Sequence, residues 1–187
     1  IESTTYYAGE KGDETADYSY NYNLGNMQVK TTSVFFYGDN LSRALAAAGS
    51  EEAMTRSLSY KWGKTVTPET SFYDIDKKIT DLVQLTGETY YFGKKGDEIA
   101  DYSYNYSVKK DAEGNYISSA AKTTTVFYYA GMKRADDAAV SSETAMTESE
   151  TYKTTSIASI DKVTPDAMNI ESTTYYAGEK GDETADY

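Results

Sequence analysis

The feature that most constrains this chain is an internal repeat. Residues 1–18, IESTTYYAGEKGDETADY, recur letter for letter as residues 170–187. A near-copy, TYYFGKKGDEIADYSYNY, occupies residues 89–106, which lie 84 positions after their counterpart at residues 5–22. Self-similarity at a fixed period is typical of repeat architectures, in which one supersecondary unit stacks on the next. We therefore interpret the chain as a tandem repeat before considering its chemistry.

Two further segments extend this repeat, each recurring 92 positions later. KTTSVFFY at residues 30–37 returns as KTTTVFYY at residues 122–129, and SEEAMTRSLSY at residues 50–60 returns as SETAMTESETY at residues 142–152. We expect the chain to be a window on a longer array whose register repeats every two modules. The predicted units are module A (residues 1–85), module B (residues 86–169) and the start of a further copy of module A (residues 170–187).

Strand-like periodicity dominates each module. In ADYSYNY, the side chains of Tyr18, Tyr20 and Tyr22 fall on one face of a strand because successive residues point to opposite sides. The preceding TTYYAG predicts a shorter strand, and the glycine-bounded GEKGDE between them predicts a hairpin turn. Further strands are expected in VKTTSVFFYG, AMTRSLSYKW and TSFYDIDKKITDLVQL, which are rich in β-branched and aromatic residues.

One segment has a helical period instead. NLSRALAAAG (residues 40–49) has apolar residues three and four apart and ends in glycine, which predicts a helix of about two turns. Module B keeps a weaker version, MKRADDAAVSS. The predicted fold is mainly β, with about five or six antiparallel meander strands and one short helix per module. We expect such modules to stack as a solenoid-like repeat or a fibrous assembly, because a single module buries little surface.

Composition excludes several classes of function. The net charge is −12 and the pI about 4.4, which argues against binding nucleic acid or anionic membrane surfaces. The chain has no Cys and no His, so it lacks disulfides, thiolate chemistry and the usual proton shuttle at neutral pH. No nucleophile elbow, P-loop or dinucleotide fingerprint occurs in the sequence. We therefore expect no enzyme, no cofactor and no membrane insertion.

A recurring Gly-Asp-Glu triplet is a candidate metal site. It places Asp13 and Glu14, and again Asp97 and Glu98, in the predicted hairpin turns. These carboxylates are weak calcium candidates, since calcium prefers oxygen ligands. The alternative is a solvated turn whose Asp caps its own backbone, and the lack of a full calcium loop favours this second interpretation.

The tyrosine rows are the other candidate site, and two interpretations stay open. Strict alternation favours a buried face, whereas exposed aromatic ladders bind sugars or a neighbouring chain. Adjacent tyrosines cannot both face the core, so one of each neighbouring pair must lie outside it or at an interface between modules. The candidate assembly ladder comprises Tyr6, Tyr7, Tyr18, Tyr20, Tyr22, Tyr90, Tyr91, Tyr102, Tyr104, Tyr106, Tyr175 and Tyr176.

A partial family resemblance is found in module B. YSYNY followed by DAEGN, within residues 102–115, resembles the bacterial tyrosine–aspartate (YD, or Rhs-type) repeats, which pair a Tyr-rich strand with a D-x-x-G-N turn. Lys110 precedes the turn where that family has Tyr, and module A has NLGN instead. The resemblance implies a secreted or surface-exposed protein made of β-sheet repeats. It covers this hairpin alone.

Three functional hypotheses follow. The first is a structural segment of a long extracellular or cell-surface tandem-repeat protein that self-associates into a filament, fibre or surface layer by helical assembly. The second is a surface adhesin or carbohydrate-binding repeat protein that presents outer tyrosines to glycans. The third is an Rhs-like β-shell. The self-similar ends favour the first, because copies that begin and end in the same module can repeat in one register.

Overall fold

The computed structural model describes residues 2–25, 28–61, 83–160 and 169–187. Hairpin turns separate most of its strands, as the glycine-bounded segments predict. The strands are β1 (Ser3–Ala8), β2 (Thr15–Tyr22), β3 (Val29–Tyr37), β4 (Met54–Lys61), β5 (Leu85–Phe92), β6 (Ile99–Lys110), β7 (Tyr116–Tyr129), β8 (Met146–Tyr152), β9 (Ile170–Ala177) and β10 (Thr184–Ala185). The helical elements are α1 (Ala44–Ala47) and the 3₁₀ turn η1 (Ile157–Ser159).

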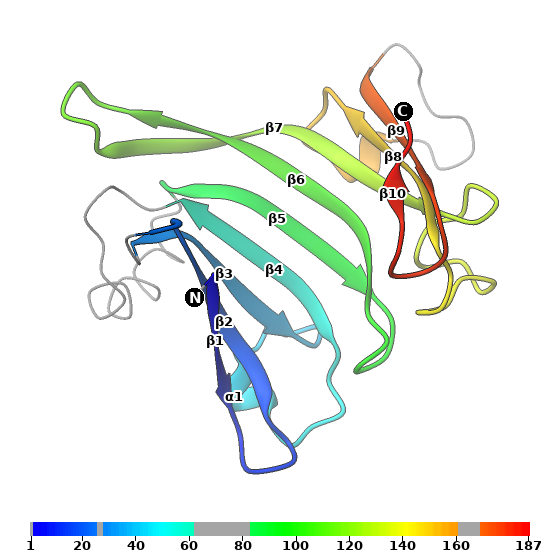
Figure 1. Ribbon diagram of the computed structural model, residues 1–187, viewed down its shortest axis with the longest axis horizontal. Helices are drawn as coiled ribbons and strands as arrows, with labels where there is room; N and C mark the ends of the chain where they lie inside the picture. Colours follow the sequence, from blue (N-terminus) through cyan, green and yellow to red (C-terminus); the bar gives the residue numbers. More distant parts are fainter. Residues whose placement is uncertain (1, 26–27, 62–82, 161–168) are drawn as a thin grey trace.

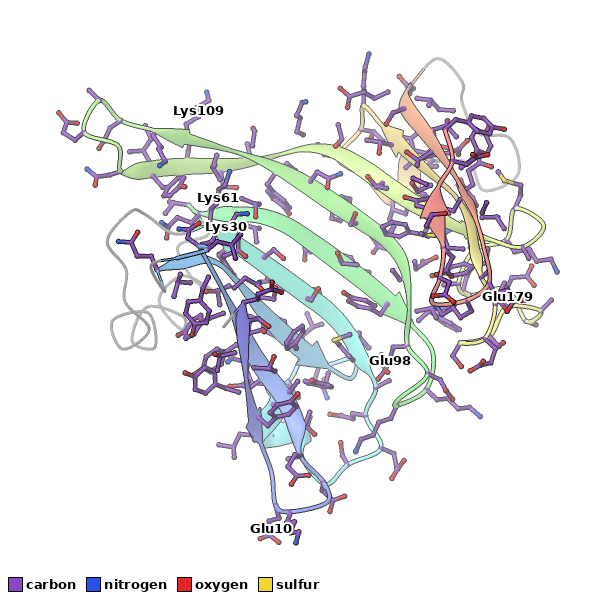
Figure 2. All side chains as sticks on the ribbon, viewed as in Figure 1. Glu10, Lys30, Lys61, Glu98, Lys109 and Glu179 are labelled. Atoms are coloured by element: carbon purple, nitrogen blue, oxygen red, sulfur yellow. The ribbon has the colours of Figure 1, made fainter. Side chains whose placement is uncertain are left out.

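The ten strands form one antiparallel sheet in which each strand pairs with the next along the chain. Strands β1–β4 belong to module A, β5–β8 to module B, and β9–β10 to the start of the further copy. Figure 1 shows a curved sheet with β1 and β10 at its two edges. Figure 2 labels Glu10 and Glu179, equivalent residues at the tips of the hairpins on these opposite edges.

The prediction of a mainly β antiparallel meander is confirmed, but the described residues do not form a solenoid-like stack. Consecutive strands pair side by side, so each module extends the same sheet laterally instead of coiling into a new layer. Each module contributes four described strands. The expected additional strand in TSFYDIDKKITDLVQL falls almost entirely on residues outside the described ranges.

The prediction of one helix per module is correct for module A and wrong for module B. Helix α1 forms in module A but spans a single turn. At the equivalent place in module B, the described residues form turns. When Arg134 is aligned with Arg43, Asp137 stands in place of Ala46 of α1. The Asp137 carboxylate accepts a hydrogen bond from the Ala139 N–H at 2.9 Å, and this local bond competes with helix formation. Neither α1 nor η1 approaches the length or apolarity that crossing a membrane would require.

A β-bulge recurs at the same place in both modules. In the β1–β2 pair, Tyr6 lies opposite Tyr18 and Tyr7 opposite Ala16, which leaves Asp17 as the extra residue. The equivalent bulge in β5–β6 leaves Asp101 unpaired with the neighbouring strand. Each bulged aspartate accepts two hydrogen bonds from an arginine side chain, Asp17 from Arg43 and Asp101 from Arg134. The bulge thus leaves the aspartate outside the strand pairing, and its carboxylate forms a bidentate ion pair.

The alternating tyrosines of module A lie in the core. Tyr18, Tyr20 and Tyr22 are at most 9% exposed, which confirms the buried-face interpretation for this row. Their counterparts in module B are half-buried. The module A cluster comprises Tyr18, Tyr20, Tyr22, Val29, Val34, Phe36, Leu58, Tyr60 and Leu85, and the smaller module B cluster comprises Val126, Tyr128, Tyr152 and Ile160.

Candidate functional site

The features that distinguish this sheet are the two junctions at which one module joins the next. Strand β4 pairs with β5 at the A–B junction, and β8 pairs with β9 at the B–A junction. The two junctions have the same register, since Arg56 lies opposite Tyr90 and its equivalent Glu148 lies opposite Tyr175. The modules therefore meet through a backbone hydrogen-bond ladder.

Stacked tyrosines mark the start of every copy. Tyr6 stacks on Tyr18 and Tyr90 on Tyr102, each with ring centroids 4.6 Å apart. Tyr175 and Tyr187 repeat the arrangement at the same distance. Such pairs add about 0.5–1.5 kcal/mol beyond the area that they bury. The first tyrosine of each adjacent pair therefore packs on the face that carries the core.

The second tyrosine of each pair lies on the opposite face, as the strand geometry requires. At the A–B junction the Tyr91 hydroxyl hydrogen-bonds the Ser57 hydroxyl at 3.0 Å. At the B–A junction the Tyr176 hydroxyl does the same with Ser149 at 3.2 Å. The equivalent Tyr7, on the edge strand β1, is 63% exposed. This tyrosine therefore contacts the preceding module at both junctions that the structure contains.

A charged centre lies on the core face of the A–B junction. Arg56 Nε is 3.3 Å from Glu88 Oε1, and the guanidinium also lies 4.9 Å from the centre of the Phe36 ring. Glu88 accepts hydrogen bonds from the hydroxyls of Tyr90 at 2.8 Å and Tyr106 at 2.9 Å. Burial, reinforced by these bonds to Glu88, raises the pKa of both tyrosines. Two neutral donors and one cation thus satisfy the buried carboxylate.

The B–A junction has a different composition at the equivalent positions. Glu148 and Glu150 replace Arg56 and Leu58, and both glutamates are at most 8% exposed. Glu150 accepts a hydrogen bond from the Tyr152 hydroxyl, which lies 3.5 Å from that of Tyr128. Burial raises the pKa of Glu148, and the neighbouring Glu150 carboxylate raises it further. No basic side chain among the described residues forms an ion pair with either glutamate.

The recurring Gly-Asp-Glu turns have a structural role in the hairpins. Glu14, Glu98 and Glu183 each accept a hydrogen bond from the backbone N–H of the glycine two residues earlier, at 2.8–2.9 Å. Glu98 and Glu183 use the second oxygen to accept from the backbone N–H of Met54 and Met146 respectively, across the junction. Figure 2 shows Glu98 beside the start of β4. The calcium candidate Glu98 is therefore engaged by one backbone donor from its own hairpin turn and one from β4.

The two aspartates of these motifs do not gather with other acidic groups. Asp97 accepts a hydrogen bond from the Ser142 hydroxyl at 3.0 Å, and Asp13 is exposed in its turn. Across the described ranges, no three acidic, His or Cys side chains cluster in a way that could hold a metal ion. The arrangement favours the turn interpretation of the motif over the calcium interpretation.

No protein-family model matches the chain, and no curated protein matches it.

Sequence reasoning overlooked the four charged residues at the junctions, namely Arg56, Glu88, Glu148 and Glu150. The signal that could have found them is a comparison of the copies residue by residue. The copies differ at these positions. Glu148 stands in place of Arg56, Glu150 in place of Leu58, and Thr4 and Thr173 in place of Glu88. Only the strand register shows that these substitutions meet one another across a junction.

Proposed function

We propose that this chain is a structural segment of a long extracellular tandem-repeat protein that forms a filament, fibre or surface layer. The observation that carries the proposal is the pairing of β4 with β5, through which modules A and B share one sheet. Repeats that share a continuous interface transmit order from unit to unit, as a filament subunit must. The acidic surface opposes non-specific association, which leaves contact to the strand edges.

The alternation of two junction types supports an assembly that repeats every two modules. An A–B junction carries the Arg56–Glu88 ion pair, and a B–A junction carries Glu148 and Glu150. We propose that the protein acts without catalysis or cofactor, and that its partners are further copies of the same repeat.

Cryo-electron microscopy of the intact protein, as purified, tests this function. We expect a continuous filament whose axial repeat matches one or two modules. Discrete particles, or beads on flexible linkers, would contradict the proposal, because modules that share a sheet cannot move independently.

A specific observation favours glycan binding as the second candidate function. Module B has a pocket lined by Phe92, Asp97, Ile99, Ala135 and Val140, among others. In module A the smaller Ala8 replaces Phe92 and packs on the cluster around α1. An apolar pocket with a few polar groups is the usual form of a small-ligand site. A glycan array tests it: saturable binding that is lost in Phe92→Ala would support an adhesin, and a pure scaffold would bind nothing.

The turn that resembles YD repeats supports the third candidate, an Rhs-like shell. In DAEGN, the Asp111 carboxylate accepts hydrogen bonds from the backbone N–H and side-chain amide of Asn115, at 2.7 and 3.1 Å. These bonds give the Asp and Asn of the motif a structural role at the tip of the β6–β7 hairpin. A shell would be seen by the same microscopy as a wide closed wall around an empty interior.

A further inference from the structure

The pocket of module B is the feature from which we argue. It lies between the turn of the β5–β6 hairpin and the segment that joins β7 to β8, and its volume is about 430 Å³. Both walls lie within residues 83–160, in the interior of the chain. Small-ligand pockets usually span about 300–1,000 Å³, so this one suits a sugar ring and its substituents.

The apolar part of the lining is buried and held in place by the sheet. Ile99 and Ala135 both line the pocket, and both belong to one buried cluster of module B. Arg134 comes directly before Ala135 and forms two hydrogen bonds with the carboxylate of Asp101 on β6. These bonds fix the segment against the sheet. A ligand therefore meets a preformed apolar surface, which lowers the entropy cost of binding.

Phe92 adds an aromatic ring to this surface. It is the last residue of β5, and it is 52% exposed although it lines the pocket. The other copies have Ala8 and Ala177 at this position, so the ring is specific to module B. The face of an aromatic ring carries partial negative charge, and it attracts the positively polarised C–H groups of a sugar ring.

Polar side chains complete the lining. Asp97 accepts a hydrogen bond from the Ser142 hydroxyl through Oδ1 at 3.0 Å, which fixes the carboxylate beside the pocket. Oδ2 of Asp97 meets no donor among the described residues. Lys94, also in the lining, supplies an ammonium group. A sugar hydroxyl both donates and accepts hydrogen bonds, so it can donate to this carboxylate and accept from this ammonium.

The equivalent place in module A is closed by helix α1. A Cβ atom placed on Gly9 would lie 3.0 Å from Cβ of Ala48, so the end of α1 lies directly against the hairpin. At the equivalent Gly93, the three atoms nearest to such a Cβ all belong to Asp97 and Glu98 of the same hairpin. The turns that take the place of α1 in module B thus leave room for a ligand.

We propose that the module B pocket binds one pyranose ring of a neutral glycan, with its C–H face on Phe92 and its hydroxyls at Asp97 and Lys94. This inference rests on the second candidate function, and it names the class of glycan and the module that holds it. Asp97 and Lys94 have opposite charges, whereas the chain carries a net charge of −12 that repels anionic sugars. In an array of alternating modules, one site in every B module would bind a repeating glycan multivalently.

A titration of the 187-residue chain followed by two-dimensional NMR tests the proposal. The probes are methyl glucopyranoside, methyl galactopyranoside and methyl mannopyranoside, with the corresponding methyl uronides as anionic comparisons. We expect at least one neutral glycoside to bind and its uronide to bind about tenfold more weakly. The amide shifts should change at residues 92–99 and 134–142. The equivalent residues 8–15 and 43–50 of module A are the control within the chain and should not respond.

Two variants and a matched control locate the site. Phe92→Ala should weaken binding about tenfold or more, because it removes the ring and the apolar area that the sugar covers. Asp97→Asn should weaken binding about threefold to tenfold, because it replaces a charged acceptor by a neutral one. Ile117 on β7 is also a large exposed apolar side chain, at 56%, and Ile117→Ala should bind as the unaltered chain does.

Several results would overturn the proposal: no binding of any neutral glycoside, equal binding of the uronides, shifts that centre on module A, or unaltered affinity in Phe92→Ala. If Phe92→Ala does not fold, the location of the shifts in the unaltered chain decides. If a glycan array shows saturable binding that Phe92→Ala leaves intact, the pocket assignment is wrong while glycan binding stands. An array without any binding removes the second candidate function itself.

Discussion

Arg56 on β4 lies diagonally across the A–B junction from Glu88 on β5, with Nε 3.3 Å from Oε1. The Arg56 Nε makes no hydrogen bond, so the contact is an ion pair supplemented by the Phe36 ring. The side chains are 20% and 11% exposed, which leaves the pair mostly screened from water. The carboxylate still has two tyrosine donors if the cation is removed.

Replacing Arg56 by Met should destabilise the chain. We expect the free energy of unfolding to fall by about 1–3 kcal/mol. Breaking a fully buried ion pair costs about 3–5 kcal/mol, and the loss is smaller here because Tyr90 and Tyr106 continue to donate hydrogen bonds to Glu88. Chemical denaturation of both proteins measures the difference. The double variant Arg56→Met/Glu88→Gln should recover most of the lost stability, because it leaves no unpaired charge. If Glu88→Gln instead added its own loss to that of Arg56→Met, the two residues would not be coupled.

Arg134→Ala should destabilise more than the matched Arg43→Ala. Both arginines form a bidentate ion pair with a bulged aspartate. The side chains of Arg134 and Asp101 are 6% and 15% exposed, whereas those of Arg43 and Asp17 are 26% and 23% exposed. We expect a loss of about 3–5 kcal/mol for Arg134 and about 1–2 kcal/mol for Arg43, because an unpaired carboxylate costs more when it is buried. Equal losses in a thermal or denaturant melt would show that burial does not set the strength of these pairs.

Glu148→Gln should change how stability depends on pH. The folded state raises the pKa of Glu148 through burial and the Glu150 carboxylate, so folding favours its protonated form. Its contribution to stability is present below the ordinary glutamate pKa and is lost as the pH rises through the raised value. We therefore expect Glu148→Gln to be more stable than the original chain at neutral pH and similar to it in acid. Melting temperatures at several pH values check this, and parallel curves would contradict it.

Alkaline pH should unfold the protein cooperatively. Burial raises the pKa of Tyr37 and of Tyr129 to about 12. Acidic side chains near each hydroxyl raise the pKa as well. Protonated tyrosine is therefore the folded form, and its stabilisation is lost as the pH rises from the ordinary value of about 10 toward 12. Tyrosinate absorbance and far-ultraviolet circular dichroism should change together over this range. Gradual ionisation without loss of strand signal would show that the rings are accessible in the folded sheet.

Local pattern was sufficient to predict most of the elements. Alternating Tyr18, Tyr20 and Tyr22 predicted a strand with one buried face because the strand period is two, and the strand forms with that face in the core. The helical period of residues 40–49 predicted α1, although only one turn forms. The weaker copy in module B was misjudged, since a single aspartate carboxylate redirects the backbone into turns.

The sequence by itself determined that the chain is a repeat, that it is mainly β, and which residues alternate between faces, because these properties depend on neighbours along the chain. The tertiary structure decided that the modules join edge to edge in one sheet, which sets Arg56 near Glu88 and buries both Glu148 and Glu150. Strand pairing brings together residues about thirty positions apart, and the spacing of side chains along one strand carries no information about which strand lies next to it.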